Sequence, residues 1–526
     1  MNKFIKYILV LVVSLFFINV SADSTYYVNI ENNTISTNNK SYSEITSYGS
    51  LEEFLEDYNN NKLPDVYLTS FLFDGVSKVK SPDLDDFIDS GTNNTKIKDL
   101  KINVLNINTT GDIELTGKAS GMMIAVNTNN VKGNINLILN GVNIDTDSKK
   151  APAIYIYNKD ITYTDCKVTI KTMKGTKNYI EGGKFKKVSL VGSDELDKYS
   201  SYYSGDNLTN YNKYTSYYGI YTKDEINNIL FAMVKADSEG LQDGDPYYFY
   251  KGSGAISSDI DLYFEGEGYL KVTSKNKEGI ETKGNLIFSG GTGDYEINAY
   301  DDCLNTTTKT GDNVRNNLTI DVNSLVAIVN DDGDEGDAID SNGTLTINGG
   351  TIYAFAHSRS GDSGLDSDGG TYINGGTVIA TGNMADKIES SSKQKYIYVN
   401  FNSKVSKDSL IVIKDQDDEI ITAFKTSKDT STLLYSSEDL DYKSFAIYIG
   451  GEIDGEEING LYTTINSYEN GTLVSYSEVL SGNFKMINNN SDNFILKLLI
   501  IEIGCLVLLI GYILIDYYII KKRYLK

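Results

Sequence analysis

From residue 101 onward, the chain alternates apolar and polar residues in short runs that are separated by Gly, Asn and Asp. Examples are KINVLNI, GDIELTG and GNINLILNGVNI, in which every second side chain is apolar. This period of two is typical of strands that bury one face. The pattern therefore predicts an all-β protein in which many short strands are joined by turns.

A repeat of about two dozen residues runs through positions 253–390. Each copy begins with a small residue and an apolar one, and continues through a strand, a Gly-Gly turn and a second strand, as in DAIDSNGTLTINGGTIYAFA. The apolar members are Ile256, Ile280, Leu304, Ile339, Leu365 and Ile388, at intervals of 24, 24, 35, 26 and 23 residues. An extra loop at 306–316 explains the longest interval. Strands and glycine turns at this period predict a solenoid of the parallel β-helix type.

Changes in the alternation suggest domain boundaries. The alternating pattern follows a mixed N-terminal segment with a capping-box helix at 51–58, and it lapses in a Tyr-rich insertion with a helix at 223–236. After residue 394 the alternation continues without the repeat. The expected parts are the N-terminal segment 23–100, the β-helix 101–394 with its insertion 194–250, a small β-sandwich-like domain 395–480, and a polar linker 481–493.

Both ends of the chain carry apolar segments. Residues 1–22 are expected to be a secretory signal peptide that is cleaved after Ala22, because two lysines precede an apolar run that closes with small residues. Residues 494–520 are expected to form a transmembrane helix, and the basic tail 521–526 is then cytoplasmic by the positive-inside rule. The sequence thus predicts a single-pass protein of the cell membrane with an extracellular body.

Composition narrows the set of partners. The chain has 72 acidic and 48 basic residues, a formal net charge of −24, and an isoelectric point near 4.5. Such a surface repels nucleic acid and attracts divalent cations. The single histidine, His357, and the absence of a Cys/His cluster exclude an imidazole or thiolate metal site. Cys166 and Cys303 are expected to be free, buried thiols because the repeat places them in distant coils.

Acidic residues flank the small-apolar pairs of the repeat. Equivalent positions of successive coils stack about 4.8 Å apart, so these acids form ladders. Like charges about 5 Å apart repel by roughly 3 kcal/mol at an effective dielectric near 20. Calcium, with bonds to oxygen of about 2.3–2.6 Å, fits between two coils better than magnesium does. The expected calcium ligands are Glu278, Glu281, Asp302, Asn305, Asp337, Asp340, Asp362, Asp366, Asp386 and Glu389.

These acids have two other interpretations. An EF-hand loop beginning at Asp332 fails, because Gly336 and Gly343 occupy its fifth and twelfth ligand positions. The second interpretation is a solvated edge of the solenoid, since Asp and Asn favour turns without any metal. The sequence favours calcium and leaves the solvated edge as its alternative.

The repeat resembles a known bacterial family. DLYFEGEGYLKVTSKNKEGIETKGNLIFSGG, DAIDSNGTLTINGGTIYAFA and GLDSDGGTYINGGTVIATG are similar to segments of the secreted carbohydrate-binding-domain proteins of clostridia and their relatives. The resemblance implies a right-handed parallel β-helix, similar in shape to family 9 pectate lyases, that binds calcium and plant-type polysaccharide. It also implies metal ligands at Asp302, Asp337, Asp340, Asp366 and Asp386. Cys303 and Lys387 depart from the family pattern, which has Gly at these positions.

Three functions follow from these observations. The favoured one is a non-catalytic, membrane-anchored protein that binds a pectic or cellulosic polysaccharide, with sugar rings stacked on tyrosines. The second is a structural stalk or adhesin without glycan specificity. The third, a calcium-dependent polysaccharide lyase, needs a base, and Lys283, Lys387 and Arg359 lie in no recognisable catalytic motif. No catalytic residue and no oligomeric state are predicted. The expected sugar contacts are Tyr202, Tyr203, Tyr217 and Tyr218.

Overall fold

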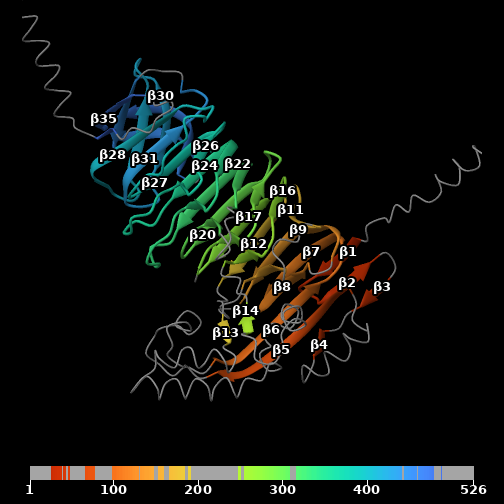
Figure 1. The fold of residues 1–526 in the computed structure, drawn as a ribbon. Helices are drawn as coiled ribbons and strands as arrows, with labels where there is room; N and C mark the ends of the chain where they lie inside the picture. The colour runs from red at the N-terminus through yellow and green to blue at the C-terminus, as the bar shows by residue number, and fades with distance from the viewer. Residues whose placement is uncertain are drawn as a thin grey trace, which may run out of the picture. The chain divides into compact units, whose positions relative to one another are not determined.

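The computed structural model describes the greater part of the chain as strands and turns (Figure 1). No helix occurs among the described residues, and none of them forms a helix that could span a membrane. The expected signal peptide, the two short helices, the four tyrosines expected to contact sugar and the segment 494–520 lie outside the described residues. The described ranges are 25–37, 40–42, 45–47, 65–76, 97–128, 131–146, 152–158, 165–183, 188–190, 247–249, 254–275, 277–307, 316–440, 444–458, 460–478 and 487–488.

The described residues belong to two compact units. The first contains residues up to 276 together with 281–293, and the second contains 277–280 together with the residues from 294 onward. The short strand β18 (Ile280–Thr282) has residues in both units. Each unit is described by itself.

The first unit is built from ladders of parallel strands. One ladder joins β6 (Ile97–Ile107), β8 (Met122–Asn127), β10 (Ile154–Tyr157) and β15 (Ile256–Ser258). A second joins β1 (Thr25–Asn29), β7 (Gly111–Ser120), β9 (Gly133–Asp145), β11 (Cys166–Thr172), β16 (Leu262–Gly266) and β19 (Leu286–Phe288). The last residues of β7 and β9 form a third ladder with β12 (Lys177–Gly182) and β17 (Tyr269–Ser274).

Antiparallel strands complete the first unit. β2 (Thr34–Thr37) pairs with β1 and with β3 (Lys40–Tyr42), and β5 (Val66–Val76) pairs with β6. β4 (Ile45–Ser47) pairs with β5 in parallel, while β13 (Val188–Leu190) and β14 (Tyr247–Phe249) form a separate antiparallel pair. Strands from the predicted N-terminal segment therefore pair directly with the parallel ladders, through β1 and β5.

Inward residues of the first unit stack in rows. Ile170 of β11 lies in register with Leu137 of β9 and with Phe264 of β16, and Phe264 lies in register with Phe288 of β19. The two phenyl rings stack with centroids 4.7 Å apart and planes 12° apart. All four side chains are buried. The alternation in the sequence thus becomes a continuous apolar core along the ladder.

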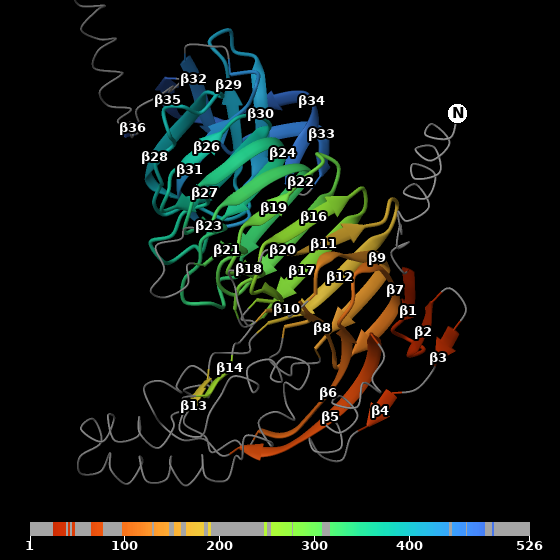
Figure 2. The same cartoon turned by 45° about the vertical axis from the view of Figure 1, so that its right-hand side comes forward.

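The second unit repeats the three-ladder arrangement (Figures 1 and 2). The first ladder contains β21 (Leu304–Thr306), β23 (Ile339–Ser341) and β25 (Asp366–Ser367). The second contains the first halves of β22 (Leu318–Val329) and β24 (Leu345–Phe355), followed by β26 (Thr371–Ile373). The third contains β20 (Asp294–Ala299), the second halves of β22 and β24, and β27 (Thr377–Gly382).

A Gly-Gly corner divides β24 between its two ladders. The register of β24 against β22 shifts near Asp321 and Gly349. Gly350 follows with a φ of +104°, and a Cβ placed there would lie 2.5 Å from the carbonyl oxygen of Val322. Only glycine fits this close approach, as the repeated Gly-Gly-Thr segments predict.

The register confirms the stacking of successive repeats. Leu304 faces Ile339 although 35 residues separate them, and Asp340 faces Asp366 in the next copy. The last copy differs, because Ile388 forms a parallel bridge with Thr371 instead of continuing the β25 ladder. The all-β composition and the parallel sheets are therefore confirmed for the described residues. Cys166 and Cys303 are free and buried, as expected.

The strands after residue 394 pack onto the second unit's ladders. β31 (Thr430–Ser436) pairs antiparallel with both β27 and β28 (Tyr396–Val405), and β28 also contacts β36 (Ile487–Asn488). A six-stranded sheet contains β29 (Leu410–Lys414), β30 (Ile420–Lys425), β32 (Ser444–Ile449), β33 (Glu452–Ile458), β34 (Leu461–Glu469) and β35 (Thr472–Glu478). The segment expected as a small domain thus continues the hydrogen bonding of the ladders.

One core joins these strands to the ladders. Val326, Tyr353 and Ile379 lie in register on β22, β24 and β27, and they pack in one buried cluster with Ile397 and Phe424 of the later strands. Their neighbours Leu325, Ile352 and Val378 are buried as well. Both faces of these strand halves are therefore covered. This explains why β22 and β24 contain the nearly continuous apolar runs LVAIV and IYAF there, instead of alternating apolar and polar residues.

Candidate functional site

The first ladder of the second unit carries one row of polar side chains beside its apolar row. Asn305 on β21 faces Asp340 on β23, and Asp340 faces Asp366 on β25. Each of these residues follows an inward apolar residue, so the alternation of the strand turns it away from the core. Three of the expected ligands therefore stand side by side on successive strands.

A second acidic row lies three or four residues earlier, in the turns that lead into these strands. The amide of Asp337 donates to Oδ1 of Asp302 at 2.8 Å, and the amide of Ser363 donates to Oδ1 of Asp337 at 2.6 Å. The amide of Gly336 donates to Oδ2 of Asp362 at 2.8 Å. These carboxylates each bond a backbone amide of a neighbouring repeat, which ties the turns together.

Four carboxyls of these two rows have pKa values above their ordinary range. Burial and the charges of neighbouring carboxylates raise the pKa of Asp337 to about 8 and that of Asp340 to about 7. Burial, with the charges of Asp301 and Asp340, raises the pKa of Asp302 well above its usual value. Burial and the charge of Asp386 also raise the pKa of Asp366. We call Asp302, Asp337, Asp340 and Asp366 the carboxylate ladder.

The donor chemistry of the ladder fits a hard divalent cation. Carboxylate and amide oxygens are the ligands that calcium prefers, and Oδ1 of Asn305 is buried without a hydrogen-bond partner in the described part of the protein. The described side chains do not, however, gather three or more His, Cys, Asp or Glu groups around one metal position. A shared cation therefore requires the side chains of neighbouring strands to turn toward one another.

Four of the expected ligands have other surroundings. In the first unit, Glu281 accepts bonds from the amide of Gly254 at 3.3 Å and from the hydroxyl of Ser257 at 3.4 Å. Glu278 adjoins Lys277, and its charge contributes to the raised pKa of that lysine. Glu389 pairs with the Lys387 ammonium at 2.7 Å, and the fourth residue, Asp386, lies beside β25.

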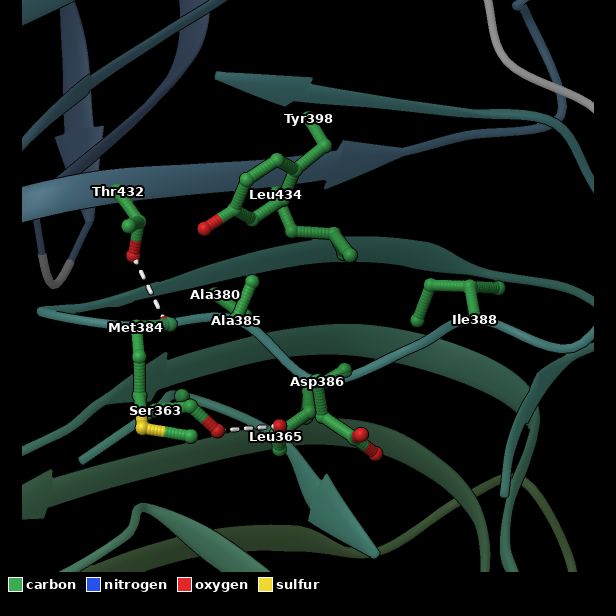
Figure 3. Close-up of a pocket in the computed structure, with 11 residues that line it drawn as sticks. Ser363, Leu365, Ala380, Met384, Ala385, Asp386, Ile388, Tyr398, Thr432 and Leu434 are labelled. Carbon is green, nitrogen blue, oxygen red and sulfur yellow. Dashed lines mark hydrogen bonds between the residues drawn. The ribbon is translucent and has the colours of Figure 1, made fainter. Parts of the chain in front are cut away.

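Asp386 is held by hydroxyls beside a small pocket. Its Oδ2 accepts bonds from Ser367 at 3.0 Å and from Thr371 at 3.2 Å. Figure 3 shows this carboxyl at the edge of a pocket whose lining is largely apolar, with Leu365 and Ile388 nearby. The pocket offers a single carboxylate, so its lining does not provide a ligand set for a metal.

Two acids outside the set of expected ligands act electrostatically on the carboxylate ladder. The negative charge of Asp301 raises the pKa of Asp302 and Asp340, and that of Asp368 raises the pKa of Asp340 and Asp366. Asp301 lies 2.7 Å from the Lys277 ammonium. Each of the two acids is close in sequence to an expected ligand. Their positions in the repeat, rather than a motif, were the signal that could have identified them.

The lone histidine lies in a buried polar network. Nδ1 of His357 is 2.7 Å from the hydroxyl of Ser360, and its Nε2 is 4.0 Å from Asp331, which also binds the Lys428 ammonium at 3.0 Å. The hydroxyl of Ser360 is also bonded to Asp362. His357 is only 1% exposed, so its imidazole has no access to a polymer in solution. This network closes a turn, as expected of a packed histidine.

The three basic residues weighed as a lyase base are engaged in local contacts. The Lys283 ammonium pairs with Asp259, and Lys387 pairs with Glu389 as described above. The Arg359 guanidinium donates to the carbonyl oxygens of Asp331 and Gly333. A lyase base must be available to remove a proton from the sugar. These ion pairs and carbonyl contacts instead hold the three side chains against the protein.

The fold and the ladder define a class of protein, an all-β chain of stacked parallel strands with carboxylates in register along one ladder. The family of carbohydrate-binding domain-containing proteins matches residues 102–210 and 220–426, and the chain belongs to this family. The match begins within β6, includes the parallel ladders of both units except β1, and ends just after β30. No curated protein and no solved structure matches the chain.

Proposed function

We propose that this protein is a non-catalytic, extracellular polysaccharide-binding protein, anchored in the cell membrane by residues 494–520 after removal of residues 1–22. Membership of the carbohydrate-binding family supports a polysaccharide partner. The name of the family refers to binding and not to a reaction. The basic tail after the apolar segment supports an extracellular body.

The proposal includes a right-handed parallel β-helix. The in-register parallel pairing of successive repeats, with three ladders in each unit, supports a coil of three sides. Crossovers between parallel strands of one sheet are right-handed in nearly all proteins, which supports that hand here. Such a coil presents flat outer sheets, on which an extended polymer can lie.

Calcium is the proposed counterion of the carboxylate ladder. The observation that carries this proposal is the set of four half-buried aspartates, in two neighbouring rows, whose pKa values are raised by partial burial and by the charges of neighbouring carboxylates. A divalent cation between two strands replaces that repulsion with attraction. Calcium also tolerates irregular oxygen geometry better than magnesium does. The ion's proposed role is to stabilise the ladder, and no step of a reaction is assigned to it.

Binding to insoluble and soluble polysaccharides tests the function. The full chain, purified in detergent, is incubated with cellulose, polygalacturonate and an unrelated polymer, with calcium and with chelator. Retention on one polymer class supports the proposal, and failure to bind any of them in calcium would favour a stalk without glycan specificity. Release of ultraviolet-absorbing unsaturated sugars from polygalacturonate would contradict the non-catalytic part of the proposal.

A further inference from the structure

Two tyrosines and two lysines alternate on the outer face of the third ladder in the first unit. β12 carries Lys177 and Tyr179, and β17 carries Tyr269 and Lys271. Between them, Asn178 and Leu270 are buried, so the alternation of each strand turns the four side chains outward. The strands lie side by side in Figures 1 and 2. We call these four residues the Tyr–Lys patch.

The register places unlike residues opposite each other. Lys177 faces Tyr269, and Tyr179 faces Lys271, so the patch is a checkerboard of aromatic rings and ammonium groups. The rings of Tyr179 and Tyr269 contact edge to face, with centroids 6.1 Å apart and planes 66° apart. Tyr179 is 39% exposed and is one of the few large aromatic side chains that the described strands leave open to solvent. The two rings thus hold each other in place while one of them faces solvent.

The charge of this region is opposite to that of the whole chain. The segments 173–182 and 266–275 contain four lysines and two glutamates, whereas acids exceed bases by 24 over the entire sequence. The two glutamates are within ion-pair distance of Lys174 and Lys275 at the margins of the patch. A local excess of positive charge beside exposed rings is suited to a ligand that is both anionic and stackable.

We propose that the Tyr–Lys patch is the binding site for an acidic polysaccharide whose repeating unit is a uronic acid. The apolar C–H face of a pyranose ring stacks on the tyrosine rings, and the uronate carboxylate takes hydrogen bonds from the lysine ammonium groups. This proposal rests on the proposed polysaccharide-binding function and gives it a location. The carboxylate ladder is in the other unit, so the two features can be changed separately.

The test uses the full chain and two polymers with the same backbone. Binding to polygalacturonate and to its fully methyl-esterified form is measured by biolayer interferometry. Tyr179→Ala with Tyr269→Ala weakens binding to both polymers by about tenfold, as truncation of an aromatic anchor does. Lys177→Gln with Lys271→Gln weakens binding to polygalacturonate only, because the methyl ester carries no charge. Tyr179→Phe with Tyr269→Phe keeps the rings and retains binding.

A matched pair on the adjoining outer face serves as the control. The Lys167 ammonium lies 4.1 Å from the ring centre of Tyr263. β11 and β16 therefore carry an ammonium group beside an aromatic ring, as the Tyr–Lys patch does. Tyr263→Ala with Lys167→Gln leaves binding unchanged. Normal binding by both patch variants, or equal losses in the control, would overturn the site while leaving the function intact. A wild-type chain that binds neither polymer would overturn the function as well. If the alanine pair lowers the melting temperature, the pair Lys177→Gln with Lys271→Gln decides the question, because it leaves both rings in place.

Discussion

At the scale of single residues, the ladder aspartates are the most unusual groups in the protein. Neighbouring repeats bring further carboxylates close to Asp337 and Asp340, while partial burial removes water that would screen their charges. Aspartates in this situation either keep a proton or need a cation. The free energy of unfolding is therefore expected to depend on both pH and the concentration of a divalent metal.

Stability without metal is expected to fall as pH rises from 5 to 8.5. The pKa of Asp337 is about 8 and that of Asp340 about 7 in the folded protein, against an ordinary value of 3.8. The folded state therefore holds more protons than the unfolded state within this window, and the stabilisation present below pH 4 is lost as pH passes through 7 and 8. Melting temperatures in chelator, measured by scanning calorimetry, should decrease across the range, and calcium should flatten the decrease. A flat profile in chelator would contradict the raised values.

Replacing one carboxylate by its amide separates repulsion from metal binding. Asp337→Asn keeps the oxygen that accepts the Ser363 amide and removes the charge. In chelator the variant should melt a few degrees higher than the wild type, since about 1 kcal/mol corresponds to 2–4 °C in a protein of this size class. Calcium should raise its melting temperature less than that of the wild type. Asp408→Asn, at an exposed turn outside the ladder, is the control.

The repeat predicted which side chains share one row, and their role as metal ligands stays a prediction. Asn305, Asp340 and Asp366 were placed in one row from the repeat alone, and the register shows that row. Asp386 was placed in the next copy by spacing, yet it bonds hydroxyls of Ser367 and Thr371. Spacing cannot reveal where a repeat stops, because the final copy has no following strand to hold it in register.

At the scale of secondary-structure elements, the glycine corners set the path of each coil. β22 and β24 are long strands, and each belongs to two ladders. β24 passes from one ladder to the other at a Gly-Gly pair, which has no side chains. Periodicity and Gly-Gly-Thr segments were enough to predict these corners. The predicted helices of the N-terminal segment and the insertion lie outside the described residues and remain predictions.

A methyl group at the β24 corner should destabilise the protein strongly. Gly350→Ala forces a Cβ to within 2.5 Å of the Val322 carbonyl oxygen at a φ of +104°. We expect a loss of about 2 kcal/mol or more in the free energy of unfolding, as for other residues strained at positive φ. Gly361→Ala is the matched control, because nothing lies within 4 Å of its added Cβ. Similar denaturant midpoints for the two variants would exclude the corner as a constraint.

At the scale of the whole molecule, the sequence identified the fold class but not how the parts join. Strands after residue 394 were expected as a separate domain, whereas β31 pairs with β27 and Val326, Tyr353 and Ile379 share their core. The signal was present in the apolar runs LVAIV and IYAF, where both strand faces are buried. The strands that cover those faces could not be predicted, since pairing between strands that are far apart in the chain leaves no periodic pattern in the sequence.

Removal of calcium should lower the stability of the entire ladder region. We expect chelation to reduce the melting temperature by several degrees, and added calcium to restore it, because repulsion along the carboxylate ladder returns when the ion leaves. Magnesium should restore less, owing to its shorter bonds and strict octahedral geometry. Elemental analysis of the purified chain provides the metal content. An unchanged melting curve in excess chelator would remove calcium from the proposal.

The antiparallel contact between β27 and β31 has a consequence for self-association. A ladder of parallel strands that ended at β27 would expose unpaired amides and carbonyls, and another copy of the chain could add to that edge. β31 runs in the opposite direction and takes those hydrogen bonds itself, while β28 covers its other side. The reversed polarity and the covering strand block the templating of further coils, so the protein's own chain protects this end against fibril growth.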